Sequence, residues 1–322
     1  MAEGAAGEPV FFDPGEQQRT RIAWLYYVEG LTQSEIAERV GMSRVRVNRE
    51  LALCRERGIV QIRINAKLAP CVALERELVK RFALKDAVIV PTPGDPALVP
   101  TVIGAAAGQY VSDRLTGGMS IGVAWGRTLL GSLRAIERRP VEGLSVVSLI
   151  GGLTRAAAIN TYETASRFAD LFGAECYYLA APTYTSDAGS RSIFIEQASI
   201  GDVLDRARRL DMAVVSVGDL GPDSTIRRLA LVGDDEAETL VGAGAVGDCL
   251  AHFIDAEGRL VDHPLNQRVI GLAPSELAAV PTSILASGGP AKEQVMRAAI
   301  NGGYLNVVIT DEESARRLLA GN

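Results

Sequence analysis

The chain has 322 residues, of which 48% are hydrophobic and 22% are charged, and these values predict a soluble protein of about two domains. Its 33 lysines and arginines stand against 39 aspartates and glutamates, so any binding of nucleic acid has to rest on a local basic patch and not on the net charge of −6. Its uncharged apolar runs all fall short of the ~18 to 20 residues that a membrane span needs, so we expect no membrane partner.

The first segment, residues 1–15, is acidic and rich in small residues. It lacks the basic stretch followed by an apolar stretch that marks a signal peptide. We therefore predict a disordered tail and a cytoplasmic protein.

A helix-turn-helix is predicted within residues 16–66. Thr32 and Glu35 have the spacing of a capping box, in which each side chain satisfies the other's backbone N–H at a helix start. The helix that follows ends at Gly41, which tolerates the left-handed backbone of a tight turn, and Ser43 is placed to cap a second helix. The preceding helix covers the pair, and residues 59–65 alternate as a strand that closes the small domain.

The second helix of this motif is predicted to read DNA. Its inward stripe is Val47, Leu51 and Cys54, at helical spacing. Arginine can bond guanine, asparagine can bond adenine, and valine can touch a thymine methyl group. Over residues 43–58, five arginines against two glutamates leave a local charge of +3, which attracts phosphates. The expected DNA-binding residues are Thr32, Ser43, Arg44, Val45, Arg46, Asn48 and Arg49.

A helical hairpin inside an ordinary core is the alternative interpretation of this motif. The capping box, the glycine turn, the apolar stripe and the basic outer face occur together, and their combination favours the DNA reader.

A linker helix over residues 67–85, with a proline-marked break near residue 70, is predicted to lead into a large domain over residues 86–322. Near-continuous apolar strands alternate there with helices, as in a parallel sheet that is buried on both faces. The fold class is therefore α/β, with a small all-α head. The predicted strands are residues 86–91, 119–125, 144–151, 175–182, 212–218, 283–288 and 305–311.

Three of these strands end in glycine-rich turns that enter helices: "GVAWGRTLL", "LIGGLTR" and "LASGGPAKEQV". Ligands bind beyond the carboxyl ends of strands in such sheets, and helix N-termini attract anions. Any one of these turns could use glycine for geometry alone. Together, and with Arg127, Thr128 and Lys292 in two of them, they favour a site for a phosphate-sized anion.

The chain resembles the SorC family of bacterial sugar-responsive transcription regulators. The resemblance covers nearly everything after residue 15, and it rests on "LTQSEIAERVGMSR", "GVAWGRTL", "YETASRFA", "GAVGDCLAHFIDAEGR", "LNQRVIGL" and the stretch that begins "ASGGPAKEQV". It implies an effector domain similar in fold to sugar-phosphate isomerases of the glucosamine-6-phosphate deaminase type, but serving as a sensor. It also implies a homodimer or homotetramer, a double-stranded operator, and a sugar, polyol or sugar-phosphate effector.

The resemblance also implies the effector-binding residues. Gly126, Arg127 and Thr128 would face a phosphate, and Gly151 and Gly152 would form the floor of the second turn. Asn160 and Asp248 would bind hydroxyl groups, and Lys292 would supply a cation.

The sequence departs from the family pattern at three positions. Ile150 stands where some members place a cation, which argues against a second phosphate clamp or a Schiff base there. Arg127 replaces a residue that is often small, which favours a different anion geometry. Glu50 replaces an apolar residue in the second helix of the motif, which puts the inner packing of that helix in question.

Two other classes of function are alternatives to a regulator of a carbohydrate or polyol catabolic operon. An isomerase or deaminase with a DNA-binding head needs a general base in its pocket. His252 and His263 flank a predicted strand-turn-strand instead, so no catalytic residue is expected. A purely architectural DNA binder would leave the large domain unexplained.

The cysteines give no sign of a metal site. Cys54, Cys71, Cys176 and Cys249 are scattered, without a CxxC spacing. Even with the two histidines they do not supply the clustered ligands that zinc requires. We expect reduced thiols, no metal and no cofactor.

Overall fold

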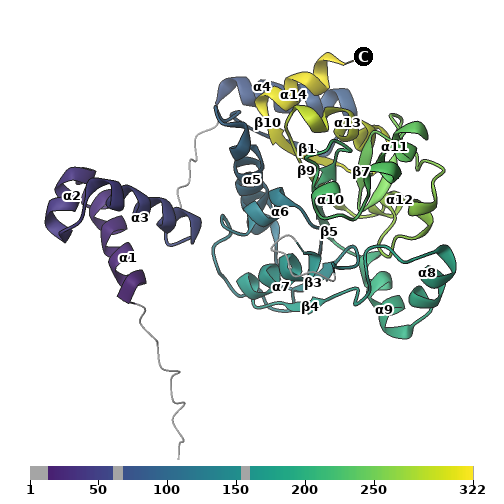
Figure 1. The fold of residues 1–322 in the computed structure, drawn as a ribbon, viewed down its shortest axis with the longest axis horizontal. Helices are drawn as coiled ribbons and strands as arrows, with labels where there is room; N and C mark the ends of the chain where they lie inside the picture. The colour runs from purple at the N-terminus through teal and green to yellow at the C-terminus, as the bar shows by residue number, and fades with distance from the viewer. Residues whose placement is uncertain (1–13, 61–67, 154–159, 322) are drawn as a thin grey trace, which may run out of the picture. The chain divides into compact units, whose positions relative to one another are not determined.

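The computed structural model describes residues 14–60, 68–153 and 160–321. The chain divides into two compact units, Met1–Asn65 and Ala66–Asn322 (Figure 1). The tail predicted over residues 1–15 and the strand predicted over residues 59–65 lie largely outside the described residues.

The described part of the small unit consists of the helices α1 (Pro14–Tyr27), α2 (Gln33–Val40) and α3 (Arg44–Glu56). Val47, Leu51 and Cys54 of α3 are all buried, as the helical spacing predicted. Ile22 and Leu25 of α1 pack against Val47 and Leu51 together with residues of α2. The three helices therefore share one apolar core.

Local hydrogen bonds fix the ends of α2 and α3. The Thr32 backbone N–H donates to Glu35 Oε2 at 2.7 Å, and the Glu35 N–H donates to Thr32 Oγ1 at 3.3 Å, which confirms the capping box. Gly41 ends α2 in the left-handed conformation, with φ of 66°, where a side chain would be strained. Ser43 Oγ then accepts the Arg46 N–H at 3.3 Å and caps α3.

Glu50 packs in α3 through an ion pair. Its Oε2 lies 3.1 Å from Arg19 Nε of α1, and the two side chains are only 18% and 16% exposed. The carboxylate thus holds α1 and α3 together.

A seven-stranded parallel sheet forms the centre of the described large unit. Its order is β1-β10-β9-β5-β2-β3-β4, and each pair of neighbours is parallel. Each of the seven predicted strands contributes one member, although the observed strands are shorter. Their bounds are β1 Asp86–Val90, β2 Ser120–Val123, β3 Ser145–Ser148, β4 Glu175–Tyr177, β5 Met212–Val215, β9 Thr282–Ala286 and β10 Val307–Asp311.

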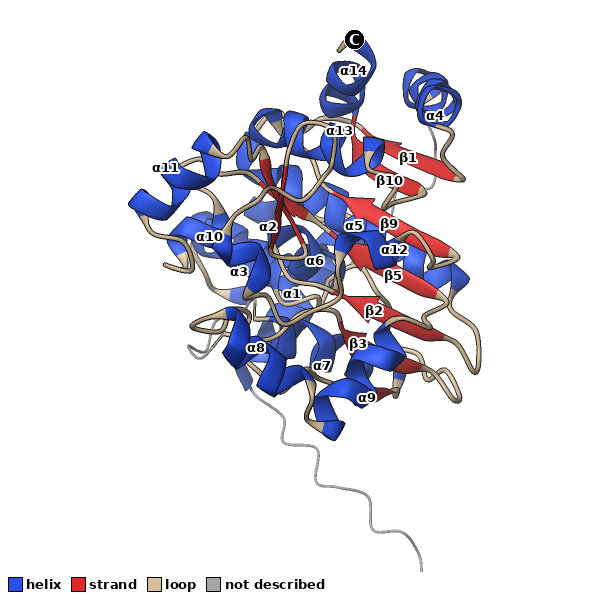
Figure 2. Ribbon diagram, turned by 90° about the vertical axis from the view of Figure 1, so that its right-hand side faces the viewer, coloured by secondary structure: helices blue, strands red, loops and turns tan. Residues whose placement is uncertain are grey.

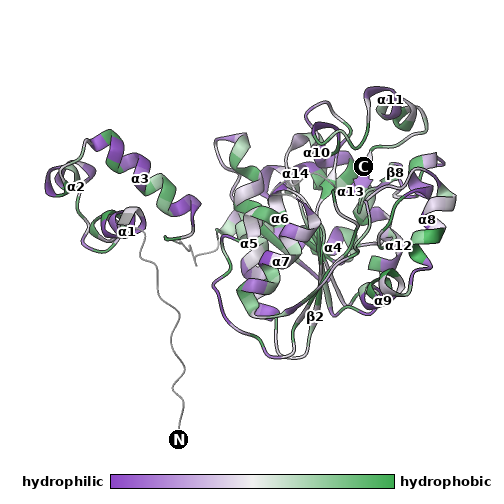
Figure 3. Cartoon of the chain, turned by 60° about the horizontal axis from the view of Figure 1, so that its bottom comes forward, coloured by the Kyte–Doolittle hydropathy of each residue, from purple (hydrophilic) through white to green (hydrophobic). Residues whose placement is uncertain are grey.

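Helices cover both faces of this sheet (Figure 2). α5, α6 and α7 lie on one side, and α9 and α12 lie on the other, with the apolar strands between them (Figure 3). None of the described helices is long and apolar enough to cross a membrane. The helices are α4 Ala69–Phe82, α5 Val99–Arg114, α6 Arg127–Ser132, α7 Thr161–Phe172, α8 Ala188–Ile195, α9 Ala198–Ala207, α10 Thr225–Arg228, α11 Asp234–Gly242, α12 Pro274–Leu277, α13 Glu293–Asn301 and α14 Glu312–Ala320, with short 3-10 turns η1 Pro96–Leu98, η2 Pro264–Gln267 and η3 Pro290–Lys292.

A second, antiparallel sheet holds β6 (Val217–Gly218), β7 (Gly247–Cys249) and β8 (His252–Ile254). The single strand predicted over residues 212–218 is wrong in this respect, because the chain leaves the parallel sheet at Ser216 and enters this one. With α10, α11 and η2, these strands form what we name the lobe, residues 217–267. The lobe has a hydrophobic cluster of its own, which includes Leu240 and Phe253.

The helix predicted as a linker, α4, is part of the large unit. Its buried side chains Cys71, Leu74 and Leu78 belong to the main hydrophobic core. Pro70 lies in its first turn, where the missing N–H costs no hydrogen bond.

Candidate functional site

The outer face of α3 exposes the side chains that the sequence predicted for DNA contacts. Arg44, Arg46, Asn48 and Arg49 are exposed, and Val45 is 81% exposed although it is apolar. Asn48 Oδ1 accepts a hydrogen bond from Gln33 Nε2 of α2 at 3.3 Å. The helix buries one face and offers a basic, partly apolar face to solvent, which is the shape that major-groove readout requires.

A pocket of about 40 Å³ lies where the carboxyl ends of the neighbouring strands β2, β5 and β9 meet. Five of the residues predicted for effector binding line it, although they come from three separate stretches of the chain. They are Gly126, Arg127 and Thr128 after β2, Asp248 on β7, and Lys292 after β9.

Other members of this pocket were not predicted from the sequence, above all Asp219. Asp219 comes directly after β6, the short strand that follows β5 in the chain. Ser216 and Thr225 line the same pocket. The signal was present, because "VSVGDLG" is another apolar strand that ends in a glycine and a charged residue. The pocket thus holds two cations, Arg127 and Lys292, and two carboxylates, Asp219 and Asp248.

Two glycines let the backbone pass close to these groups. Gly126 has φ of 127°, a conformation that strains other residues, and it begins α6. Gly218 lies so close to Asp248 Oδ1 that a Cβ atom would collide with the carboxylate. Asp248 can therefore reach the pocket only because residue 218 has no side chain.

Burial raises the pKa of Asp248 to about 7, from an ordinary value of 3.8. The Ala251 N–H and the charge of Lys292 act in the opposite direction, whereas the charge of Asp219 raises this pKa further. Asp248 is only 5% exposed. A group in this state can donate or accept a hydrogen bond near neutral pH, as a partner for a sugar hydroxyl must.

Burial likewise lowers the pKa of Lys292. The charges of Asp219 and Asp248 oppose this shift, and the charge of Arg127 adds to it. The ammonium group therefore depends on the two carboxylates for its stability in the pocket. An anion bound beside Lys292 and Arg127 would relieve the repulsion between the two cations.

Gly151 and Gly152 are not among the described residues that line this pocket. A Cβ atom on Gly151 would lie 2.5 Å from the Pro182 carbonyl oxygen, and one on Gly152 would collide with the Tyr162 ring. Close packing of the chain after β3 accounts for both glycines.

Asn160 also lies outside the lining of the pocket, at the start of α7. Its Oδ1 accepts the N–H groups of Leu153 and Tyr162, both at 3.3 Å, and its Nδ2 donates to the Leu153 carbonyl at 3.0 Å. The amide is therefore already engaged in capping the helix.

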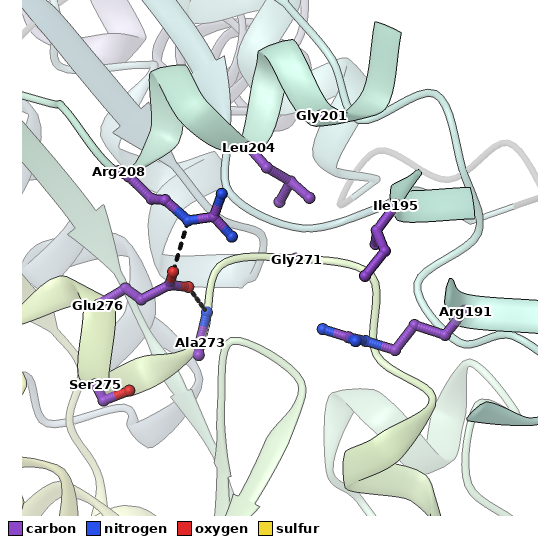
Figure 4. Close-up of a pocket in the computed structure, with 9 residues that line it drawn as sticks. All are labelled: Arg191, Ile195, Gly201, Leu204, Arg208, Gly271, Ala273, Ser275 and Glu276. Carbon is purple, nitrogen blue, oxygen red and sulfur yellow. Dashed lines mark hydrogen bonds and ion pairs between the residues drawn. The ribbon is translucent and has the colours of Figure 1, made fainter. Parts of the chain in front are cut away.

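A larger hollow of about 510 Å³ lies between α8, α9 and residues 271–276 (Figure 4). Arg208 Nε donates to Glu276 Oε1 at 2.7 Å, and the Ala273 N–H donates to Glu276 Oε2 at 2.7 Å. None of the predicted effector-binding residues lines this hollow. We favour the smaller pocket as the functional site, because its charged groups converge on one space at the strand ends.

Both histidines have structural partners. Burial lowers the pKa of His252 to about 4, and its Nδ1 donates to the Leu250 carbonyl at 2.9 Å. His263 begins η2, where its Nδ1 accepts the Leu265 N–H at 3.3 Å. Neither histidine lines the charged pocket.

Comparison with known proteins places the large unit in a family. Residues 66–320 match the family model described as "Putative sugar-binding domain". The chain is 33% identical over 308 residues to the transcriptional regulator LsrR of Klebsiella pneumoniae, covering 95% of this chain and 93% of that protein. It is 29% identical over 309 residues to the erythritol catabolism regulatory protein EryD of Brucella abortus, covering 95% of this chain and 98% of that protein.

A solved structure extends this likeness to three dimensions. The full-length sorbitol operon regulator SorC of Klebsiella pneumoniae superposes with a TM-score of 0.72 and 25% identity, over 94% of this chain and 98% of that one. The likeness therefore includes the small unit as well as the large one.

Proposed function

The chain belongs to the SorC family of sugar-binding transcriptional regulators, and we propose that it controls a carbohydrate or polyol catabolic operon. It binds operator DNA through the small unit, and a sugar, polyol or sugar phosphate in the large unit modulates that binding. The names of EryD and SorC, which refer to erythritol catabolism and a sorbitol operon, support this class of operon. The relatives and structural neighbours are regulators and not enzymes.

The observation that carries the effector half of the proposal is the convergence of two cations and two carboxylates in one pocket. Arg127 and Lys292 suit a phosphate, which prefers cationic donors. Asp219 and Asp248 suit the hydroxyl groups of the same molecule. Gly151, Gly152 and Asn160, which the family resemblance also implies, do not line this pocket in the described part of the chain, and their role in effector binding stays a prediction.

The DNA half of the proposal rests on α3. Arg44, Arg49 and Asn48 would reach base edges, and Arg46 would contact the phosphate backbone. Thr32 and Ser43 lie at the N-termini of α2 and α3, where N–H groups and hydroxyls commonly bind phosphate oxygens. A protein that binds a chromosomal operator would act in the bacterial cytoplasm.

We further propose that the protein is a homodimer or homotetramer through its large unit. A single head with a local charge of +3 makes too few contacts for specific binding at physiological salt. Two heads related by a two-fold axis would read the two halves of a palindromic operator. Light scattering on the full chain at micromolar concentration tests this, and a monomer would contradict it.

The decisive experiment combines ligand screening with DNA binding. Thermal shift across tetritols, pentitols, hexitols, sugars and their phosphates should identify a compound that stabilises the protein, since a ligand adds RT ln(1 + [L]/Kd) to stability. The same compound should then change the affinity for DNA from the promoter of the neighbouring operon. Turnover of the compound would instead favour an isomerase or deaminase, and stabilisation without any change in DNA binding would contradict the regulatory proposal.

A further inference from the structure

The turn between β7 and β8 has an unusual backbone. Cys249 pairs with His252, so Leu250 and Ala251 form a two-residue hairpin turn. Both have positive φ angles, 51° and 61°, which such a turn requires but which glycine and asparagine normally supply. Both residues are also buried, at 1% and 0% exposure. Surrounding contacts must therefore hold the turn in place, and such strain often marks a functional site.

The peptide groups of Ala251 connect this turn to two polar side chains. The Ala251 N–H donates to Asp248 Oδ2 at 3.1 Å. The Tyr184 hydroxyl donates to the Ala251 carbonyl at 2.6 Å. Tyr184 also packs against both the main core and the hydrophobic cluster of the lobe. One residue of the turn thus lies between a tyrosine hydroxyl and a carboxylate of the pocket.

The two oxygens of the Asp248 carboxylate make different contacts. Oδ2 is occupied by the turn, and Oδ1 lies over Gly218, which lines the same pocket. The orientation of the carboxylate therefore depends on the position of the Ala251 N–H. The Tyr184 hydroxyl bonds the carbonyl oxygen of the same residue.

We propose that Tyr184 is a positioning residue of the effector pocket, which acts through the strained Leu250–Ala251 turn to orient Asp248. The inference rests on the proposed function for the role of Asp248 as an effector contact. Tyr184 itself does not line the pocket. Its hydroxyl holds the turn, and the turn fixes which oxygen of Asp248 is presented to the effector.

The proposal has a readout that does not need an effector. The Ala251 N–H lowers the pKa of Asp248, and the charge of Lys292 does so as well, whereas burial and Asp219 raise it. Arg127 is the other charged residue that lines this pocket. In Tyr184→Phe the turn loses the hydrogen bond to the Ala251 carbonyl, so the Ala251 N–H should form a weaker hydrogen bond with Asp248. The pKa of Asp248 should then rise above its value of about 7.

The experiment is a pH titration of the full chain with ¹³C-labelled aspartate carboxyl groups, followed by NMR, with the signal assigned by its loss in Asp248→Asn. We expect Tyr184→Phe to raise the midpoint by about half a pH unit or more. Tyr162→Phe is the matched control, because the Tyr162 hydroxyl lies 2.7 and 2.8 Å from the carbonyl oxygens of Leu179 and Ala181 and can donate to either, and Tyr162 does not line the pocket. Equal midpoints in Tyr184→Phe and wild type, or equal shifts in both tyrosine variants, would overturn the proposal.

A rescue variant separates positioning from general stability. Glycine adopts left-handed backbone without strain, so Ala251→Gly should hold the turn without help from Tyr184. Tyr184→Phe combined with Ala251→Gly should return the midpoint to the wild-type value. If Tyr184→Phe alone folds poorly, the double variant can be titrated in its place. A double variant that keeps the raised midpoint would contradict the role of the turn.

Binding of erythritol and D-ribose 5-phosphate to the same variants separates the two proposals. If the midpoint shifts and neither these compounds nor the wider panel binds wild type, positioning of Asp248 stands and the effector site fails. If a compound binds Tyr184→Phe and wild type equally while the midpoint is unmoved, the effector site stands and Tyr184 has no positioning role.

Discussion

The outer face of α3 and the pocket at the strand ends are both built from charged side chains, but in opposite surroundings. On α3 the arginines are exposed, keep their hydration and act through a summed field. In the pocket, Asp248 is 5% exposed and Lys292 is half-buried, so each charge depends on the others for its stability. A substitution on α3 should therefore act alone, whereas a substitution in the pocket should also change its neighbours.

The largest effect is expected for Asp248→Asn, as a change in the pH dependence of stability. The pKa of Asp248 is raised from 3.8 to about 7 in the folded protein, so the folded state binds this proton more tightly than the unfolded chain does. Its contribution to stability is full at acidic pH and is lost as the pH rises from about 4 to about 7. Asparagine has no such proton to lose.

Relative to wild type, Asp248→Asn should therefore gain stability from pH 4 to pH 7, by up to about 4 kcal/mol at ~1.4 kcal/mol per pH unit. Melting temperatures measured across this range test the sign as well as the size. Asp262→Asn, at an exposed position of the lobe, is the control and should keep the wild-type profile. A stability difference between Asp248→Asn and wild type that stays the same at every pH would mean that burial does not raise the pKa of Asp248.

The next effect is expected for Lys292→Ala, which should weaken the effector response without removing operator binding. One lost charge-assisted contact of about 1.5 to 3 kcal/mol corresponds to a roughly tenfold to hundredfold higher effector requirement. Titration of DNA binding with the stabilising compound measures it, and Lys80→Ala on the exposed side of α4 is the control. An unchanged titration would remove Lys292 from the site and favour an unphosphorylated polyol.

Arg49→Ala should cost about 1 to 3 kcal/mol in operator affinity and relax the base preference at one position. Arg46→Ala provides the contrast, because a phosphate contact should weaken binding to all sequences alike and reduce the salt dependence. Fluorescence anisotropy with a set of single-base operator variants distinguishes the two. If Arg49→Ala leaves both affinity and specificity unchanged, α3 does not read the bases.

The smallest effect is expected for Thr32→Ala, which removes one half of the capping box of α2. Loss of an N-cap side chain costs about 1 kcal/mol of helix stability. The unfolding of the small unit, followed by the fluorescence of Trp24 on α1, should shift to lower denaturant accordingly. Thr32→Ser keeps the hydroxyl and should behave as wild type, so equal losses in both variants would contradict the capping role.

The small unit and the sheet could be predicted from the sequence because their signals are local. Thr32 and Glu35 are three residues apart, and the stripe of Val47, Leu51 and Cys54 lies within one helix. The strands are similarly recognisable as short apolar runs between helices, and their parallel pairing follows from that alternation.

The pocket could be predicted only in part, because no single segment of the chain determines the order of the strands in the sheet. β2 and β9 flank β5 in the sheet, so the carboxyl ends of all three strands lie side by side. This arrangement brings Arg127 and Lys292, which are 165 positions apart in the chain, into one pocket and adds Asp219, which was not predicted from the sequence. The turn after β3 had the same glycine pattern, but packing against Pro182 and Tyr162 uses its glycines instead.

The pocket's volume of about 40 Å³ has a consequence for how the protein senses. This space is narrow for a molecule of the size of a sugar phosphate. We therefore expect the pocket to widen when such an effector enters, and the wider conformation to be the less populated one in the absence of effector. The apparent affinity is then the intrinsic affinity reduced by the fraction of molecules that are open. A substitution that loosens the lobe would therefore lower the effector concentration needed for response without adding a single contact to the ligand.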